Sequence, residues 1–290
     1  MESQHLSPSV FWCWPFACLL LCIALFPLIP KVSHWWEHNR NKLLVSGTLA
    51  AVICLYYFLS PGAGVAVLST VLHHAVIKDY IPFMVLLFSL YTISGGIRLS
   101  GDIPAHPITN SGFLLLGAVL ANLIGTTGAS MLLVRPLLQI NAERHHTKHT
   151  FIFFIFMVSN IGGSLLPIGD PPLFLGYLRQ VPFLWTLHLL PLWALAIGIL
   201  LVIYFIWDML AYRHEGKRDI YWDETVRIPL ALEGKRNFLL LVGVVLAVAF
   251  LVPGRVLPVV GWTVPEIHLC EIVLLSLTGL SLVWTPKPIY

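Results

Sequence analysis

Charged residues are scarce in this sequence. Asp, Glu, Lys and Arg together make up 11% of its 290 residues, whereas hydrophobic residues make up 58%. Soluble domains carry about a quarter charged residues, so the composition excludes an ordinary soluble domain. The formal net charge of +3 comes from basic residues scattered over the loops between apolar stretches, which does not indicate nucleic-acid binding.

Cysteine pairs and an N-terminal basic segment are also absent. All the cysteines lie within apolar stretches and none forms a CxxC motif, which excludes a disulfide or zinc framework; they are Cys13, Cys18, Cys22, Cys54 and Cys270. No Lys or Arg precedes the first apolar stretch, and a secretory signal peptide normally begins with basic residues. We therefore expect the first apolar stretch to remain in the protein, and we expect no cofactor.

Long apolar stretches are abundant instead. Those long enough to cross a bilayer are residues 11–30, 43–60, 81–97, 186–207, 237–253 and 267–284. Two further apolar stretches, 111–140 and 150–182, are interrupted by small and polar residues. The sequence predicts an all-α polytopic membrane protein that is embedded in the lipid bilayer.

The basic loops predict how the chain crosses the membrane. Loops 31–42, 141–149 and 209–236 carry most of the Lys and Arg residues, and such loops tend to be cytoplasmic. If 111–140 were one ordinary span, the second and third loops would lie on the opposite side from the first. A re-entrant hairpin over 111–140 restores the rule, with the N-terminus outside and all three loops cytoplasmic.

The middle of 111–140 contains residues suited to the tip of such a hairpin. The stretch ANLIGTTGAS places Asn122, Thr126 and Thr127 beside two glycines. Unpaired backbone groups are tolerated at membrane depth only when they are buried in protein or face water. The alternative is that the glycines form a close-packing face of a plain helix; the charge distribution makes us favour the hairpin.

A second break lies within 150–182, where SNIGGSLLPIGDPP follows an apolar run. Glycines and Pro167 weaken the helix there, and Asp170 before two prolines is typical of a helix start. Two half-helices joined by unwound chain can bind ions. Asp170 is either a simple helix cap or an ion-binding carboxylate, and we favour the second because an intramembrane acid is costly.

These two motifs carry a resemblance to a known family. GTTGASMLLVRP followed by SNIGGSLLPIGDPPLFLG is similar to the ion-transporter superfamily, over about residues 80–285. This group contains NhaD-type sodium/proton antiporters, arsenite permeases and sodium-coupled di- and tricarboxylate (citrate-type) transporters, and the NhaD-type proteins are the most similar.

The resemblance implies two inverted repeats, each with a re-entrant hairpin and a broken helix, in a homodimer that works by an elevator mechanism. Residues 1–100 would then be scaffold helices, 101–182 a transport segment, and 183–290 further spans. This chain carries one hairpin and one broken helix, so it corresponds to the N-terminal half. A second repeat would come from a longer chain, a complementary chain or a second copy.

The resemblance also implies the ion-binding residues. Sodium would bind around Thr126, Asn160 and Asp170. The full predicted set is Asn122, Thr126, Thr127, Ser159, Asn160, Gly162, Gly163, Pro167, Gly169 and Asp170.

The leading functional hypothesis is exchange of sodium or lithium for protons across a prokaryotic inner membrane. The alternatives are a sodium-coupled organic-anion transporter or an arsenite transporter, for which Arg135 could attract the anion. A third is an intramembrane aspartyl protease, which would need Asp208 or Glu271 as a second carboxylate. Neither of these acids lies in a broken segment like that around Asp170, so we predict that the protein is not an enzyme. The HHTKH stretch at 145–149 is interpreted as ordinary interfacial histidines, because no carboxylate partner is evident.

Overall fold

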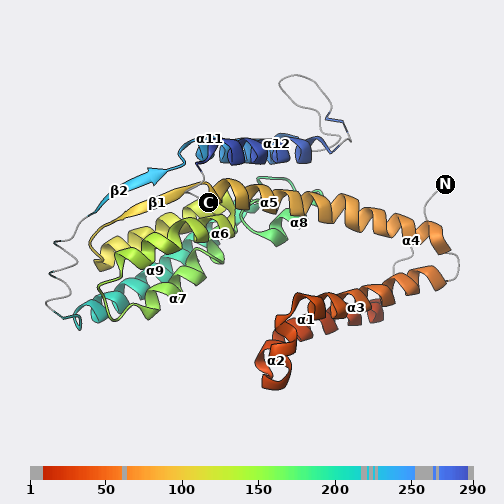
Figure 1. Ribbon diagram of the computed structural model, residues 1–290, viewed down its shortest axis with the longest axis horizontal. Helices are drawn as coiled ribbons and strands as arrows, with labels where there is room; N and C mark the ends of the chain where they lie inside the picture. Colours follow the sequence, from red (N-terminus) through yellow and green to blue (C-terminus); the bar gives the residue numbers. More distant parts are fainter. Residues whose placement is uncertain are drawn as a thin grey trace. The chain divides into compact units, whose positions relative to one another are not determined.

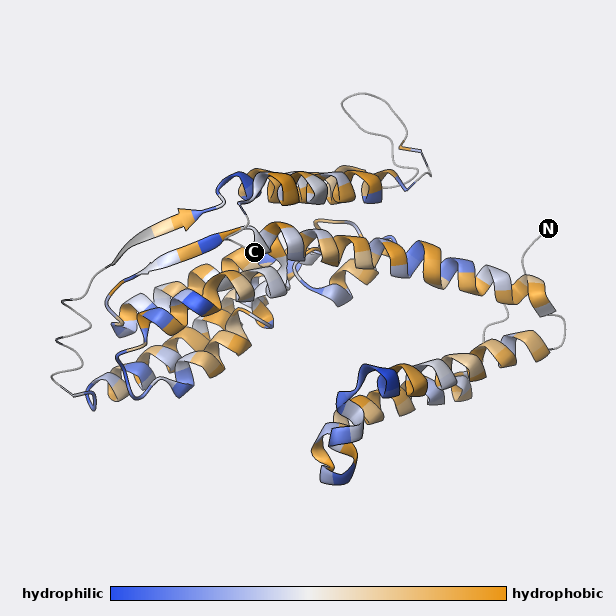
Figure 2. Ribbon diagram, viewed as in Figure 1, coloured by the Kyte–Doolittle hydropathy of each residue, from blue (hydrophilic) through white to orange (hydrophobic). Residues whose placement is uncertain are grey.

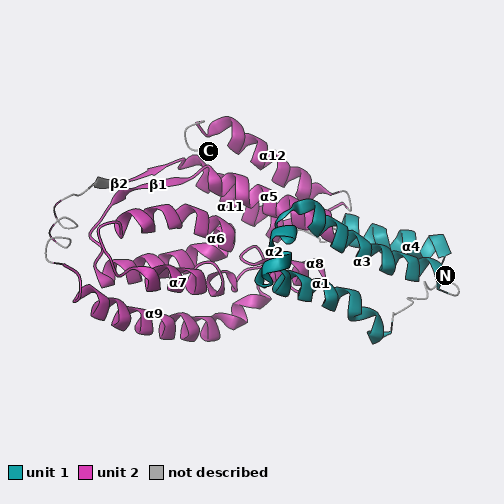
Figure 3. Ribbon diagram, turned by 60° about the horizontal axis from the view of Figure 1, so that its bottom comes forward, with its two compact units in different colours: residues 1–78 teal, residues 79–290 magenta. Residues whose placement is uncertain are grey.

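A computed structural model of the protein describes residues 9–60, 64–216, 221, 225, 228–251, 264–265 and 268–286. Parts of the predicted loop 209–236 lie outside these residues. The described chain is almost entirely helical (Figure 1), which confirms the all-α prediction. Contacts divide it into two units, residues 1–78 and 79–290 (Figure 3).

Five helices or helix runs are long and apolar enough to cross a membrane. They are Val10–Leu28, Asn39–Leu59, Gly64–Gly95, Pro107–Ile140 and Trp185–Tyr212. Two shorter apolar helices, α11 (Arg236–Phe250) and α12 (Leu269–Trp284), match the last two predicted spans. The run from Gly64 begins earlier than the predicted span 81–97, because residues 64–80 are also helical.

The first unit contains short apolar helices and one long one. They are η1 (Val10–Cys13), α1 (Trp14–Leu25), η2 (Phe26–Leu28), α2 (Pro30–Glu37), α3 (Asn39–Leu59), α4 (Gly64–Leu72) and most of the π-helix η3 (His73–Tyr80). Hydrophobic residues cover most of α1, α3 and α4, whereas α2 and η3 also carry charged and polar residues (Figure 2). None of the apolar window of α3 is buried. Apolar helices with so little burial are what lipid-facing spans require.

The second unit is built around α6 (Pro107–Ile140). Its other described elements are α5 (Ile81–Gly95), β1 (Arg98–Asp102), α7 (Lys148–Met157), η4 (Ile161–Gly163), α8 (Pro171–Leu178), η5 (Trp185–Leu189), α9 (Leu190–Tyr212), β2 (Ile228–Glu233), α11 and α12. The buried apolar side chains of α5, α6, α7, α9 and α11 form one core. The core therefore gathers the elements on both sides of the predicted hairpin and break.

The α6 segment is a helical hairpin and not one straight helix. Gly125 interrupts it with φ 76° and ψ 155°, a conformation that glycine adopts without steric cost. Asn110 Nδ2 donates to Asn141 Oδ1 over 2.9 Å, although the two residues are 31 apart in the chain. In one straight helix they would be separated by about 46 Å. The chain therefore reverses at Gly125, inside the stretch predicted as the tip.

A two-stranded antiparallel sheet was not expected from the sequence. β1 pairs with β2 so that Arg98 lies opposite Glu233 and Ser100 opposite Ala231. Asp102 ends β1. The sheet joins the linker before the hairpin to the segment that precedes α11.

The buried side chain of Asn237, 1% exposed, joins three helix ends. Its Nδ2 donates to the carbonyl oxygen of Gly96 and to the hydroxyl of Thr285, and Ser281 donates to its Oδ1. The C-terminal end of α5, the start of α11 and the end of α12 are therefore held together by one amide.

Candidate functional site

The predicted break lies between α7 and α8. α7 ends at Met157, the chain forms one short 3-10 turn, and α8 begins at Pro171. Asp170 occupies the N-cap position with extended backbone, φ −143° and ψ 135°, but its side chain makes no capping hydrogen bond. The carboxylate is therefore not used as the simple cap that was the alternative interpretation.

The hairpin tip and the break are joined directly through their backbones. The backbone N–H of Thr126 donates to the carbonyl oxygen of Gly169 over 3.0 Å. A Cβ on Gly163 would lie 2.6 Å from Cγ2 of Thr126, and a Cβ on Gly169 would overlap the carbonyl oxygen of Gly163. Glycine is therefore needed at 163, where the break meets the tip, and at 169, where two parts of the break approach each other, because a Cβ does not fit at either position. The glycines thus serve close packing as well as the turn.

Polar side chains around the break support its unwound backbone. Asn122 accepts a hydrogen bond from the N–H of Leu165 over 2.8 Å, and Trp193 Nε1 donates to the carbonyl oxygen of Gly162 over 3.2 Å. The hydroxyls of Ser130 and Ser159 lie 2.7 Å apart. The first two contacts satisfy backbone groups that a continuous helix would have satisfied itself, and the third joins the hairpin to the break through side chains.

A cavity of about 300 Å³ lies between the tip and the break. It is lined by residues 124–128 of the tip, residues 167–171 of the break, Phe174 and one face of α5. Five residues of the predicted ion site therefore share one cavity, namely Thr126, Thr127, Pro167, Gly169 and Asp170.

The other predicted residues lie outside the cavity lining. Asn122 supports the backbone at Leu165, Ser159 bonds to Ser130, and Gly162 and Gly163 belong to the 3-10 turn. Asn160 is exposed and is not among the residues that line the cavity. Of the three residues predicted to bind sodium, the structure thus brings Thr126 and Asp170 together on one cavity and leaves Asn160 apart.

The charge of the cavity is one-sided. Among the described residues that line it, Asp170 is the one carboxylate, and none is Lys, Arg or His. The first two residues of α8 are prolines, which have no N–H, and the N–H groups of Leu173 and Phe174 bond to the carbonyl oxygen of Asp170. This helix N-terminus therefore offers its dipole but few hydrogen-bond donors to an anion.

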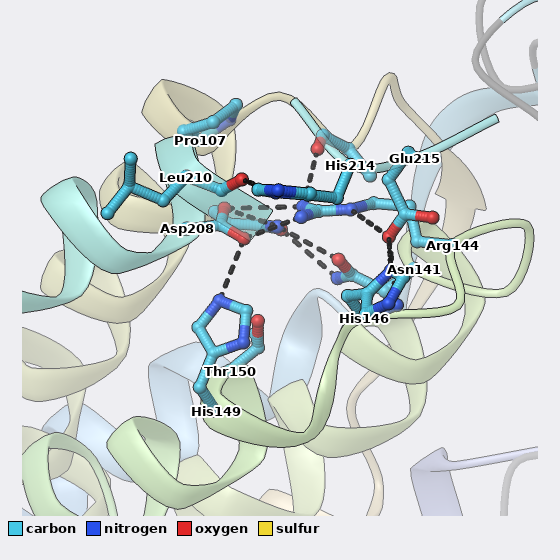
Figure 4. Close-up of polar contacts among 12 residues, drawn as sticks. Pro107, Asn141, Arg144, His146, His149, Thr150, Asp208, Leu210, His214 and Glu215 are labelled. Atoms are coloured by element: carbon cyan, nitrogen blue, oxygen red, sulfur yellow. Dashed lines mark hydrogen bonds and ion pairs between the residues drawn. The ribbon is translucent and has the colours of Figure 1, made fainter. Parts of the chain in front are cut away.

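A second polar cluster lies at the base of the hairpin (Figure 4). Arg144 donates to both oxygens of Asp208, at 2.6 Å and 3.2 Å, and His149 Nε2 lies 2.9 Å from Asp208 Oδ1. The side chains of Arg144 and Asp208 are 2% and 0% exposed. Tyr204 and Asn110 also donate to this carboxylate, so Asp208 is surrounded by donors.

Glu215 completes the cluster from the chain after α9. Its oxygens accept the backbone N–H groups of His145 and His146, at 3.1 Å and 2.8 Å, and Nε of Arg144 lies 3.7 Å away. Burial alone would raise the pKa of Glu215, but these N–H groups and Arg144 more than offset it, so the pKa is lowered. For Arg144 burial alone would lower the pKa, but its carboxylate partners raise it by more, so the pKa is raised overall.

This cluster corrects two expectations from the sequence. The HHTKH stretch does have a carboxylate partner, because His149 bonds to Asp208 59 residues further along the chain. Arg144, counted as an exposed loop charge, is 6% exposed. The one available signal was Asp208 itself, a lone acid near the end of an apolar span. Asp208, one of the two candidate second carboxylates of the protease alternative, is not among the residues that line the cavity beside Asp170.

The fold and the cavity define a polytopic α-helical membrane protein with a hairpin and a broken helix around one polar site. The chain belongs to a transporter family described as "Putative citrate transport", whose profile matches residues 4–290. The match includes the first spans, which the resemblance over residues 80–285 did not cover. No curated protein and no solved structure matches the chain.

Proposed function

We propose that the protein carries a small carboxylate anion such as citrate across the membrane, coupled to a cation that binds in the cavity beside Asp170. The observation that carries the proposal is the uncapped carboxylate of Asp170 on a cavity with no basic lining residue among those described. An anion cannot enter beside a fixed negative charge unless a cation neutralises it first. Family membership supplies the class of anion.

The cation would be bound by oxygen atoms. Asp170 supplies a carboxylate, Thr126 and Thr127 supply hydroxyls, and the break supplies backbone carbonyls. Unwound backbone between half-helices is a recurrent sodium site in membrane carriers. Because the lining is otherwise apolar, a cation that enters must exchange its water for these oxygens. We therefore favour a mechanism in which sodium binds in the cavity together with the anion.

Sodium/proton exchange is the second candidate, and the same carboxylate favours it. A partly buried carboxylate can hold either a proton or a sodium ion, and competition between the two is sufficient for exchange. No anion is then needed.

The remaining parts of the proposal concern assembly and orientation. We propose a homodimer with an elevator movement of the hairpin and break, and a second repeat from another chain segment or copy that closes the site. We also propose an inner-membrane location with the N-terminus outside and the basic segments 31–42, 141–149 and 209–236 cytoplasmic. The first of these was predicted as a loop, but it consists of α2 and the start of α3. Cysteine labelling of segment 31–42 from each side of oriented vesicles tests the orientation.

Transport by the purified protein in liposomes separates the two candidates. An inward sodium gradient at equal pH should drive uptake of labelled citrate, and Asp170→Asn should abolish the sodium dependence. Glu37→Gln is the matched control, because the Glu37 side chain is 70% exposed and contacts His34; it should transport normally. Sodium-driven collapse of a pH gradient without citrate uptake would favour the exchanger. Normal sodium dependence in Asp170→Asn would refute the site.

A further inference from the structure

We propose that a pocket between α7 and α9 binds one anionic phospholipid, with the headgroup on a histidine and lysine rim and an acyl chain along an apolar wall. The pocket has a volume of about 1000 Å³. It is separate from the cavity at the hairpin tip, and the proposal does not depend on which ion is transported.

The rim of the pocket consists of proton-donating and basic side chains. His145, His146, Lys148 and His214 are all exposed, and His149 lies behind them. These residues come from the loop before α7, the start of α7 and the chain just after α9. Among the described lining residues none is acidic. The rim therefore presents one fixed positive charge and several imidazole groups to a ligand.

The nearby carboxylates are buried behind this rim, where Glu215 Oε1 lies 3.6 Å from Nδ1 of His146 and Asp208 bonds to His149. The side chains of Asp208 and Glu215 are 0% exposed. Asp208 accepts from Arg144 and His149, and Glu215 accepts from two backbone N–H groups. Their charges are therefore neutralised from inside the protein, as Figure 4 shows for the contacts around Arg144. An anion at the rim would meet Lys148 and the imidazoles first.

The wall of the pocket is an apolar stripe on α9. Ile203, Ile206, Trp207 and Leu210 follow at helical spacing and are 46%, 55%, 55% and 52% exposed. Ile152 of α7, 50% exposed, faces the same pocket. Residues at positions i, i+3, i+4 and i+7 share one helix face, so the stripe runs along the span and ends at the rim.

The combination of wall and rim selects the ligand. An apolar wall on a membrane span is covered by acyl chains, and an interfacial tryptophan is typical of the headgroup level. Basic pockets between membrane helices at one end of the spans are typical binding sites of anionic lipid headgroups. A free phosphate would leave the wall in water. A second copy docked on the same pocket by two-fold symmetry would bring two Lys148 side chains toward each other.

Native mass spectrometry of the full chain in neutral detergent tests the proposal. Phosphatidylglycerol should remain bound at protein-to-lipid ratios at which phosphatidylcholine with the same acyl chains is lost. Lys148→Gln should weaken the Kd for phosphatidylglycerol by about fivefold, since one basic residue at a membrane surface contributes about 1 kcal/mol. Lys42→Gln is the matched control: Lys42 is also exposed near the start of a span, α3, and should have no effect.

A second variant tests the wall independently of charge. Ile206→Ser should weaken phosphatidylglycerol and phosphatidylcholine alike, and an unchanged circular-dichroism spectrum would show that the helix is intact. Equal effects of Lys148→Gln and Lys42→Gln would overturn the proposal, because the attraction would then be general. Displacement of phosphatidylglycerol by inorganic phosphate would also overturn it. So would a dimer that forms without bound lipid and dissociates in the Lys148→Gln variant, because the pocket would then bind a second copy.

Discussion

Replacing Arg144 with methionine should destabilise the protein more than the loss of any exposed charge. The variant keeps most of the apolar length of the side chain but removes the guanidinium that lies 2.6 Å from Asp208 and 3.7 Å from Glu215. Both carboxylate side chains are 0% exposed. Asp208 would keep His149, Tyr204 and Asn110 as donors but lose its one permanent positive charge.

The expected cost follows from this burial. Removing one partner of a buried ion pair costs about 3–5 kcal/mol, because a buried charge is left uncompensated. Asp208→Asn should cost less, since Arg144 would still face Glu215 and donate to the carbonyl oxygen of Ala105. The double variant should recover part of the loss, with a coupling energy of about 1–3 kcal/mol for two residues in direct contact.

Unfolding in mixed micelles, followed by tryptophan fluorescence over a denaturant series, measures these free energies. Arg213→Met is the matched control, because Arg213 is exposed and its guanidinium makes a 4.0 Å contact to the sulfur of Met209. That variant should change the free energy of unfolding by less than about 0.5 kcal/mol. Equal costs for Arg144→Met and Arg213→Met, or strictly additive effects in the double variant, would refute the buried pair.

Three further variants test other parts of the structure. Gly169→Ala should lower the free energy of unfolding by about 1–3 kcal/mol through overpacking and abolish transport. Gly198→Ala is the control, because nothing lies within 4 Å of the new Cβ, and it should do neither. Equal transport by both variants would contradict the close approach at the break. Asn122→Ala should cost about 1–3 kcal/mol in unfolding free energy by leaving a buried N–H unpaired, and no loss would show that the amide does not support the break. Because the pKa of Glu215 is lowered in the folded state, its contribution to stability is present above the unfolded pKa, about 4.3, and disappears as the pH falls through the folded pKa. Glu215→Gln should therefore reduce the loss of unfolding free energy on acidification, measured over a pH series.

Local sequence was sufficient for the features that depend on chain composition. The spans follow from apolar length, and the reversal at Gly125 follows from a glycine-rich polar stretch within an apolar run. The break before Pro171 follows from glycine and proline, which disfavour a helix whatever packs around it. The candidate cavity was partly predictable for the same reason, because its tip and its break are both local signals.

Pairings between distant segments could not be predicted in this way. β1 and β2 pair across more than a hundred residues, and neither stretch shows which partner it will take. His149 and Asp208 lie in different helices, and neither stretch shows which residue it will face. Asn160 was included in the site because it lies in the motif, but side-chain direction in unwound chain depends on packing. The structure leaves it exposed.

Arg144 also changes the reasoning that predicted the hairpin. The charge rule counted it as a basic residue of loop 141–149, yet it is buried against two carboxylates and adds no net positive charge to that loop. Lys148 alone remains as an exposed fixed charge there, which is weak support for a cytoplasmic loop. The hairpin does not need that support, because the hydrogen bonds between Asn110 and Asn141 place both ends of α6 together. Whichever side of the membrane loop 141–149 occupies, the linker before α6 lies on the same side.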